Sequence, residues 1–282
     1  MNTDQKKIYQ NIKKTYNVEK QTSIYETLND QKASESYTPD HMLIEYNPFG
    51  SNTLSLYVYF TTDSPVSVSY TVHVNDKDIS DFTRTAYQEN TYQTEHEFQI
   101  IGLIPDITNT ITFTLTSEDG VTSTYTTSYD MPSLYGEEKV KLDTQTLSTS
   151  EQLSDGLYVI LGNDSSSMDF MYYYDNDGIL RGEVPLLGYR SHRILFDDSY
   201  MYYSISEKKI ARVNRLGQVT NVYQLGQYKL HHDYIFDDSG NLLVLASNTT
   251  QDSVEDIVLK INTDTGDCIY DWGERCMGGY TL

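Results

Sequence analysis

The sequence predicts an all-β protein: an immunoglobulin- or fibronectin-III-like β-sandwich followed by part of a β-propeller, about three blades. The first observation is a repeat, because residues 191–199 recur forty positions later at 231–239 with Phe-Asp-Asp-Ser unchanged. A repeat of about this length, built of short apolar runs and Asp/Asn/Gly turns, is typical of propeller blades. The second observation is that residues 41–132 alternate between short strands and turns, which is typical of an antiparallel sandwich.

The elements follow in chain order. Residues 1–37 are polar and predict one helix and a linker, because Ile8, Ile12 and Tyr16 recur at helical spacing. The sandwich domain is expected over residues 38–133. Its clearest strands are expected over 54–60, 66–74, 97–101, 110–116 and 121–129. A polar connector over 134–155 leads into the propeller domain, 156–282.

The propeller domain divides into three units of short strands. Gly178, Gly217 and Gly266 each precede the last strand of one unit, within Asp/Asn/Gly turns. A closed propeller needs at least about four blades, and three would leave sheet edges exposed. We therefore expect the chain to be an incomplete part of a longer protein.

Charge and composition exclude several classes of partner. The formal net charge of −21 argues against nucleic acid and against an anionic membrane surface. No apolar run is long enough to span a membrane, and the first residues carry no signal peptide. An anionic substrate would need a locally basic pocket, so the scarce arginines and histidines become the candidates for binding it.

Metal and cofactor sites are not expected. No Cys/His spacing suits zinc. Asp175-Asn176-Asp177-Gly178 matches part of a calcium loop, but Tyr173 stands where another ligand is needed, so a tight turn is expected. Cys268 and Cys276 are eight residues apart and leave two alternatives open, a disulfide or two thiols.

Three histidines are the candidate functional residues. His192 and His232 fall on the same position of the repeat, at the start of consecutive blades. The first strand of a blade lines the central channel, where an imidazole can exchange a proton or stabilise a transferring anion. The alternative is a structural histidine bonded to the backbone. His231 is expected to point away from His232, since consecutive strand residues face opposite sides.

Two regions of the sequence resemble the bacterial aryl-sulfate sulfotransferases, the co-substrate-independent arylsulfotransferase family. Tyr46-Asn47-Pro48-Phe49-Gly50, and Thr94–Phe98 with Gly102-Leu103, are similar to that family's N-terminal immunoglobulin-like domain. His231-His232-Asp233, followed by Ser239–Leu245, is similar to its His-(Asp/Glu)…Asn-Gly-Asn blade segment. The two regions cover most of the chain and follow the family's order.

The resemblance implies a six-bladed propeller that moves a sulfuryl group from a phenolic sulfate donor to a phenol acceptor. The transfer passes through a sulfo-histidine and needs no cofactor. His232 matches the family's first active-site histidine and is the expected catalytic residue, with His192 and His231 as candidate substrate-binding residues. The resemblance also implies a homodimer through the first domain and a periplasmic or extracellular location.

The sequence departs from the family pattern after the third unit. The family's second histidine, in a Trp-x-His-x-Asn-Ser segment, its active-site arginine and its sulfated histidine have no match here. Trp272 is followed instead by Gly-Glu-Arg. We therefore expect this chain to lack the nucleophile and to be inactive alone. The rival hypothesis is a non-catalytic sandwich–propeller module for binding or adhesion.

Overall fold

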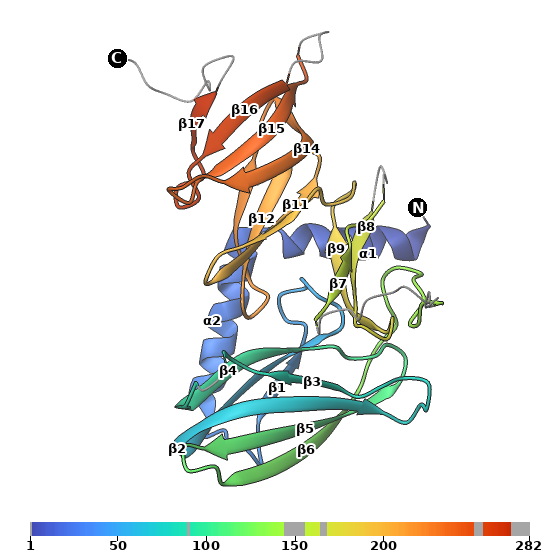
Figure 1. Ribbon diagram of the computed structural model, residues 1–282, viewed down its shortest axis with the longest axis vertical. Coiled ribbons are helices and arrows are strands. Elements are labelled where there is room, and N and C mark those ends of the chain that lie inside the picture. The colour runs from blue at the N-terminus through green and yellow to red at the C-terminus, as the bar shows by residue number, and fades with distance from the viewer. Residues whose placement is uncertain (1, 89–90, 144–155, 164–167, 251–255, 272–282) are drawn as a thin grey trace, which may run out of the picture.

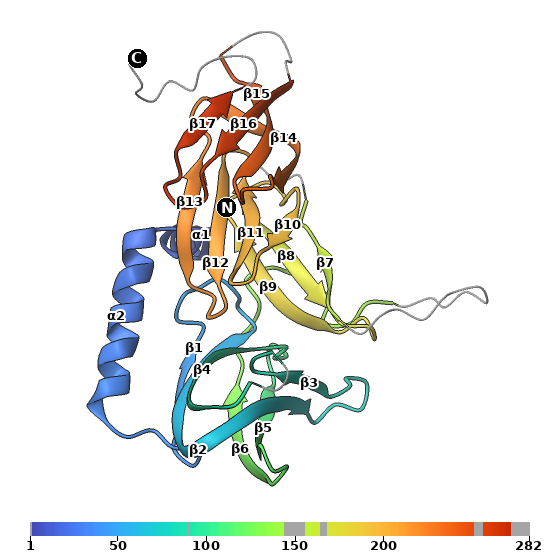
Figure 2. The same cartoon turned by 60° about the vertical axis from the view of Figure 1, so that its left-hand side comes forward.

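The computed structural model describes residues 2–88, 91–143, 156–163, 168–250 and 256–271. Three separate sheets fan out from a β-sandwich, and two helices lie along one side (Figures 1 and 2). The three sheets do not close into a ring. This confirms the all-β class and the sandwich followed by part of a propeller.

The N-terminal segment forms two helices, α1 (Thr3–Thr15) and α2 (Val18–Ser34), where the sequence predicts one helix and a linker. Asn2 caps α1 and Asn17 caps α2, because each side chain accepts a hydrogen bond from a backbone N–H of the first turn. The second helix escapes sequence analysis because one of its two buried positions is polar. Gln21 is fully buried, seven residues before buried Leu28, so the hydrophobic repeat is broken.

The β-sandwich is built around one long strand that belongs to both layers. Its strands are β1 (Leu43–Tyr46), β2 (Ser55–Val74), β3 (Phe82–Thr85), β4 (Gln93–Ile101), β5 (Thr108–Ser117) and β6 (Thr122–Asp130). The first half of β2 pairs with β1 and β4, and its second half pairs with β3 and β5. The core between the layers is aromatic, with Phe98 at 6.3 Å from both Phe60 and Phe113 between ring centroids.

The sequence predicts two strands where the structure has the single strand β2. Pro65 lies between the two predicted pieces, and a proline has no N–H for a ladder hydrogen bond. In the structure, the pairing with β4 shifts register between Thr61 and Val66. The strand therefore passes through Pro65 where no ladder bond to β4 is required.

Three sheets follow, and they are called blades 1, 2 and 3. Blade 1 contains β7 (Tyr158–Ile160), β8 (Asp169–Tyr174) and β9 (Leu180–Leu186). Blade 2 contains β10 (Ile194–Phe196), β11 (Tyr200–Ser206), β12 (Lys209–Asn214) and β13 (Val219–Gln224). Blade 3 contains β14 (Tyr228–Phe236), β15 (Leu242–Asn248), β16 (Asp256–Ile261) and β17 (Cys268–Asp271). Each of these three blades is an antiparallel sheet with its strands paired in chain order.

The repeated Phe-Asp-Asp-Ser segment lies at the first hairpin of blades 2 and 3, and the turn of blade 3 is one residue longer, since Phe196 pairs with Met201 and Phe236 pairs with Leu242. Asp197 accepts hydrogen bonds from the backbone N–H groups of Ser199 and Tyr200. Asp237 likewise accepts from the backbone N–H of Ser239, and its second bond comes from Asn241, one position further along than in blade 2. The first aspartate of each pair therefore closes a turn, as short acidic side chains commonly do.

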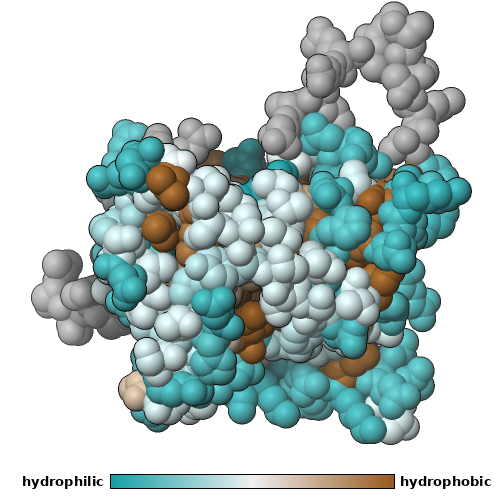
Figure 3. Space-filling model, turned by 90° about the horizontal axis from the view of Figure 1, so that it is seen from below, coloured by the Kyte–Doolittle hydropathy of each residue, from teal (hydrophilic) through white to brown (hydrophobic). Residues whose placement is uncertain are grey.

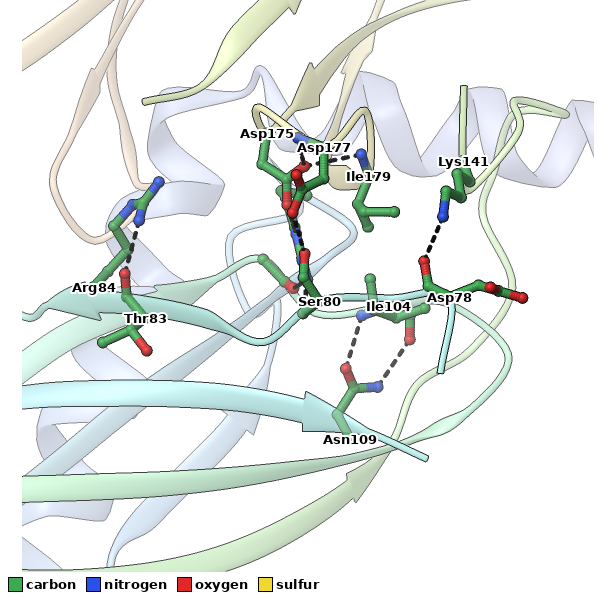
Figure 4. A network of polar contacts seen from close by, with 12 residues as sticks. Asp78, Ser80, Thr83, Arg84, Ile104, Asn109, Lys141, Asp175, Asp177 and Ile179 are labelled. Carbon is green, nitrogen blue, oxygen red and sulfur yellow. Dashed lines mark hydrogen bonds and ion pairs between the residues drawn. The ribbon is translucent and has the colours of Figure 1, made fainter. Parts of the chain in front are cut away.

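A buried arginine joins blade 1 to the sandwich. The Arg181 guanidinium pairs with Asp175 at 2.7 Å, and it donates to the backbone carbonyls of Ser80 and Gly102 at 2.6 and 3.3 Å. Figure 4 shows Ser80 of the sandwich facing Asp175 and Asp177 of blade 1, and the Ser80 hydroxyl donates to Asp177 at 2.7 Å. These contacts hold blade 1 in place against the sandwich.

Candidate functional site

The two histidines of the repeat meet between blades 2 and 3. His192 lies just before β10, and His232 lies within β14. The His192 Nδ1 atom is 3.1 Å from the His232 carbonyl oxygen. Because a carbonyl only accepts, Nδ1 carries the proton in this contact. The backbone N–H of His192 donates to the Ser204 hydroxyl at 2.9 Å, which fixes the start of blade 2.

A break in β14 shapes the second half of the site. The pairing of β14 with β15 shifts register between Leu230 and Tyr234, and His232 has φ of 75°. A side chain other than glycine in this left-handed region is strained, and such strain concentrates at functional sites. The expectation that His231 points away from His232 is wrong, because their ring centroids are 4.0 Å apart. The bulge interrupts the alternation of faces that a regular strand would impose.

Tyr234 ties the two histidine segments together across the blades. Its ring is almost fully buried, and its hydroxyl donates to the Arg193 carbonyl and accepts from the Ser204 N–H at 2.8 Å. Arg193 Nε lies 3.2 Å from an oxygen of Asp233, beside His232. The segment carrying His192 is therefore held to the segment carrying His232 by side-chain and backbone contacts.

Two arginines lie close to His192 in sequence, and one of them, Arg193, is paired with Asp233. Arg190 and Arg193 flank His192 in sequence, and the ring of Tyr189 lies 5.5 Å from the His192 ring. Burial lowers the pKa of His192, the hydrogen bond to the His232 carbonyl opposes this, and the charge of Arg190 lowers the pKa further. A lowered pKa keeps this imidazole neutral at neutral pH, with its proton on Nδ1.

Comparison with known proteins identifies the chain. The model of the family described as arylsulfotransferase (ASST) matches residues 143–275, and the model of the arylsulfotransferase Ig-like domain matches residues 43–132. The chain belongs to the arylsulfotransferase family. A search of curated proteins found no match. The family assignment supports an arylsulfotransferase-type function with phenolic substrates in general.

The arylsulfotransferase (ASST) model covers the candidate site, because all three histidines lie within the residues that it matches. The environments of His192 and His232 differ. The His192 ring bonds a backbone carbonyl, which is what the structural alternative expects of a blade-start histidine. His232 is exposed, and its imidazole makes no hydrogen bond to the part of the protein that the structure describes. Of the two repeat histidines, His232 is therefore the one whose ring is exposed, while the Nε2 atom of His192 is buried without a partner among the described residues.

Sequence analysis missed the residues that support the histidines. Arg190 and Arg193 could have been identified from the sequence, since cationic residues are few in this chain and both lie within two residues of His192. Ser204 and Tyr234 carried no such signal, because their roles depend on contacts that folding creates, within blade 2 for Ser204 and His192 and between blades 2 and 3 for Ser204 and Tyr234. The strained backbone of His232 likewise has no sequence signal, since it is not glycine.

The other sites considered from sequence have structural roles or lie elsewhere. Asp175 accepts bonds from the N–H groups of Asp177 and Ile179 and pairs with Arg181, so its carboxylate holds a turn. The described residues hold no cluster of three His, Cys, Asp or Glu side chains suited to a metal ion. Cys268 is disulfide-bonded, and Cys276 lies outside the described residues, as does Trp272. Neither described helix is apolar and long enough to cross a lipid bilayer.

Proposed function

We propose that this chain supplies the sulfuryl-binding part of an aryl-sulfate sulfotransferase. The enzyme moves a sulfuryl group from a phenolic sulfate ester to a phenol through a sulfo-histidine intermediate. Family membership supports the reaction class. The site is proposed from one observation: the His192 ring hydrogen-bonds the backbone carbonyl of His232, which has a strained backbone and an exposed ring. Arg190 and Arg193 lie close to His192 in sequence.

The reaction needs groups that stabilise negative charge on the sulfonyl oxygens. A histidine nitrogen attacks sulfur, a new N–S bond forms, and the S–O bond to the aryl group breaks to release a phenolate. The oxygen of the acceptor phenol then attacks the same sulfur, the N–S bond breaks, and the phenol proton passes to a base. An imidazole N–H of His232, aimed at these oxygens, lowers the energy of both transition states.

The proposed role of His192 is to hold His232 in its observed conformation. Its Nδ1–H bond to the His232 carbonyl stabilises the left-handed backbone that exposes the His232 ring. His231 packs against that ring and limits its orientation. We propose that none of these three histidines is the nucleophile. The chain alone therefore binds the donor without turning it over.

The test compares donor binding and phenolate release. The wild-type chain is expected to bind 4-nitrophenyl sulfate, and His232→Ala to bind it about ten-fold more weakly, because one charge-assisted hydrogen bond is lost. In an enzyme form that turns over, the same change lowers kcat by about 100-fold. His73→Ala is the control, since His73 is exposed on the sandwich and pairs with Asp81.

Two outcomes would contradict the proposal. Equal donor binding by His232→Ala and His73→Ala would make His232 a structural residue only. A burst of 4-nitrophenolate with a sulfo group left on this chain would show that the nucleophile lies within it.

A cellular location and an oligomeric state can also be proposed. We propose that the protein works in the periplasm or outside the cell, where disulfides persist, and the disulfide at Cys268 supports this. We also propose a homodimer, and sedimentation of the purified chain tests it. A monomer at all concentrations would exclude the dimer.

A further inference from the structure

A cavity lies where the sandwich meets blades 1 and 2. Its volume is about 680 Å³, within the range of small-molecule sites. Four aromatic side chains line it, Tyr70 of the sandwich, Tyr173 of blade 1, and Phe196 and Tyr200 of blade 2. The surface seen in Figure 3 is mostly hydrophilic, with hydrophobic side chains in small separate patches. Aliphatic side chains, among them Leu157, Val159 and Val184, complete the apolar walls of the cavity.

The charges in the cavity favour an anion. Apart from tyrosines, its ionisable residues are Arg84, Arg215 and Asp197. The Asp197 carboxylate already accepts from two backbone N–H groups and from the Tyr202 hydroxyl at 2.9 Å. Two guanidinium groups, each with five N–H donors, line the cavity with this one carboxylate, and each donates to a backbone carbonyl, Arg84 to Thr83 at 2.7 Å and Arg215 to Asp198 at 3.0 Å. On a chain with a formal net charge of −21, this is a local reversal of charge.

A buried hydroxyl gives an independent indication of a ligand. Ser51 is 4% exposed and lines the cavity, and its Oγ has no hydrogen-bond partner among the described residues. The wall is tight here, because a Cβ atom at Gly217 would lie 2.7 Å from that Oγ. A buried hydroxyl without a partner is unfavourable, and a hydrogen bond to a ligand oxygen would remove that cost.

We propose that this cavity binds an aromatic monoanion of the aryl sulfate class, at a site separate from the three histidines. The aromatic walls take the ring system, and the arginines and Ser51 take the anionic group. The volume exceeds the need of a single ring, so an aryl group of two fused rings fills it better. Small ligands with both parts in place bind far better than either part alone.

The test is calorimetric titration with 2-naphthyl sulfate in the His232→Ala background, which separates the cavity from the histidine site. Binding at least ten-fold tighter than that of phenyl sulfate, 2-naphthol or inorganic sulfate is expected. Arg215→Gln should weaken binding by about ten-fold. Val159→Trp, which fills the cavity from an exposed position of β7, should abolish it. Lys229→Gln on blade 3 is the matched control and should change nothing, with folding of each variant checked by circular dichroism.

Several results would overturn the cavity site. They are equal affinity with and without Val159→Trp, inorganic sulfate binding as tightly as the naphthyl ester, or no binding in the His232→Ala background. The last result would leave the proposed function intact. Conversely, His232→Ala could leave 4-nitrophenyl sulfate binding unchanged while the cavity variants respond. The proposed function would then fail and the cavity site would stand.

Discussion

A buried histidine in the sandwich should make the stability of this protein depend on pH. His96, on β4, is fully buried and stacks on Phe60 at 4.7 Å between ring centroids. Its Nδ1 atom has no hydrogen-bond partner among the described residues. Burial lowers the pKa of His96 from 6.5 to about 4.

The direction in which stability changes with pH follows from the number of protons that the folded and unfolded chains bind. Between about pH 6.5 and about pH 4, the unfolded chain holds a proton at His96 that the folded chain does not. The free energy of unfolding therefore falls as the pH drops through this window, and the loss is complete below the folded pKa. A pKa difference of about 2.5 corresponds to about 3 kcal/mol, at about 1.36 kcal/mol per pH unit.

The measurement is urea unfolding followed by circular dichroism, for wild type and His96→Phe, from about pH 7.5 to about pH 4. Phenylalanine keeps a ring in the aromatic core and removes the titrating group. The variant should gain up to about 3 kcal/mol over wild type at the acid end, and much less at neutral pH. His41→Phe, at an exposed position, is the control. Parallel pH curves for wild type and His96→Phe would refute the reasoning.

Two further predictions concern contacts between domains. Arg181→Met should destabilise the protein by about 3–5 kcal/mol in urea unfolding, because it leaves Asp175 buried without its charged partner. Arg181→Lys should not restore the loss, since an ammonium lacks the planar fork. Gly217→Ala should cost more than Gly240→Ala: both have positive φ, but only the first Cβ would meet Gln99, at 2.6 Å. Equal losses of stability at the two glycines would show that the contact with Gln99 has no effect.

The repeat and the strand pattern were predictable because both depend on local sequence. A hairpin closed by Asp197 or Asp237 needs only its own few residues, so the Phe-Asp-Asp-Ser repeat identified blades directly. Helix α2 was not predictable in this way. Gln21 is buried because its amide accepts from the Val219 N–H and donates to the Phe49 carbonyl, and both partners are distant in sequence.

For the candidate site, sequence analysis identified the three histidines but misjudged their geometry. The repeat placed His192 and His232 at equivalent positions, and the structure brings them into contact. The bulge of β14 could not be predicted, since the left-handed backbone of His232 contradicts its local preference. It is held instead by contacts from blade 2, such as the Tyr234 hydroxyl to the Arg193 carbonyl.

The amide of Gln21 also has a consequence for self-association. β13 is the outermost strand of blade 2, and unpaired backbone N–H groups along such a strand can recruit a strand from another molecule. The Gln21 side chain accepts a hydrogen bond from the Val219 N–H at 3.0 Å, and the beginning of α2 contacts β13 there. A peptide chain adding to this edge would first have to displace the helix. The first turn of α2 therefore protects the Val219 end of this edge against the cross-strand contacts that begin aggregation.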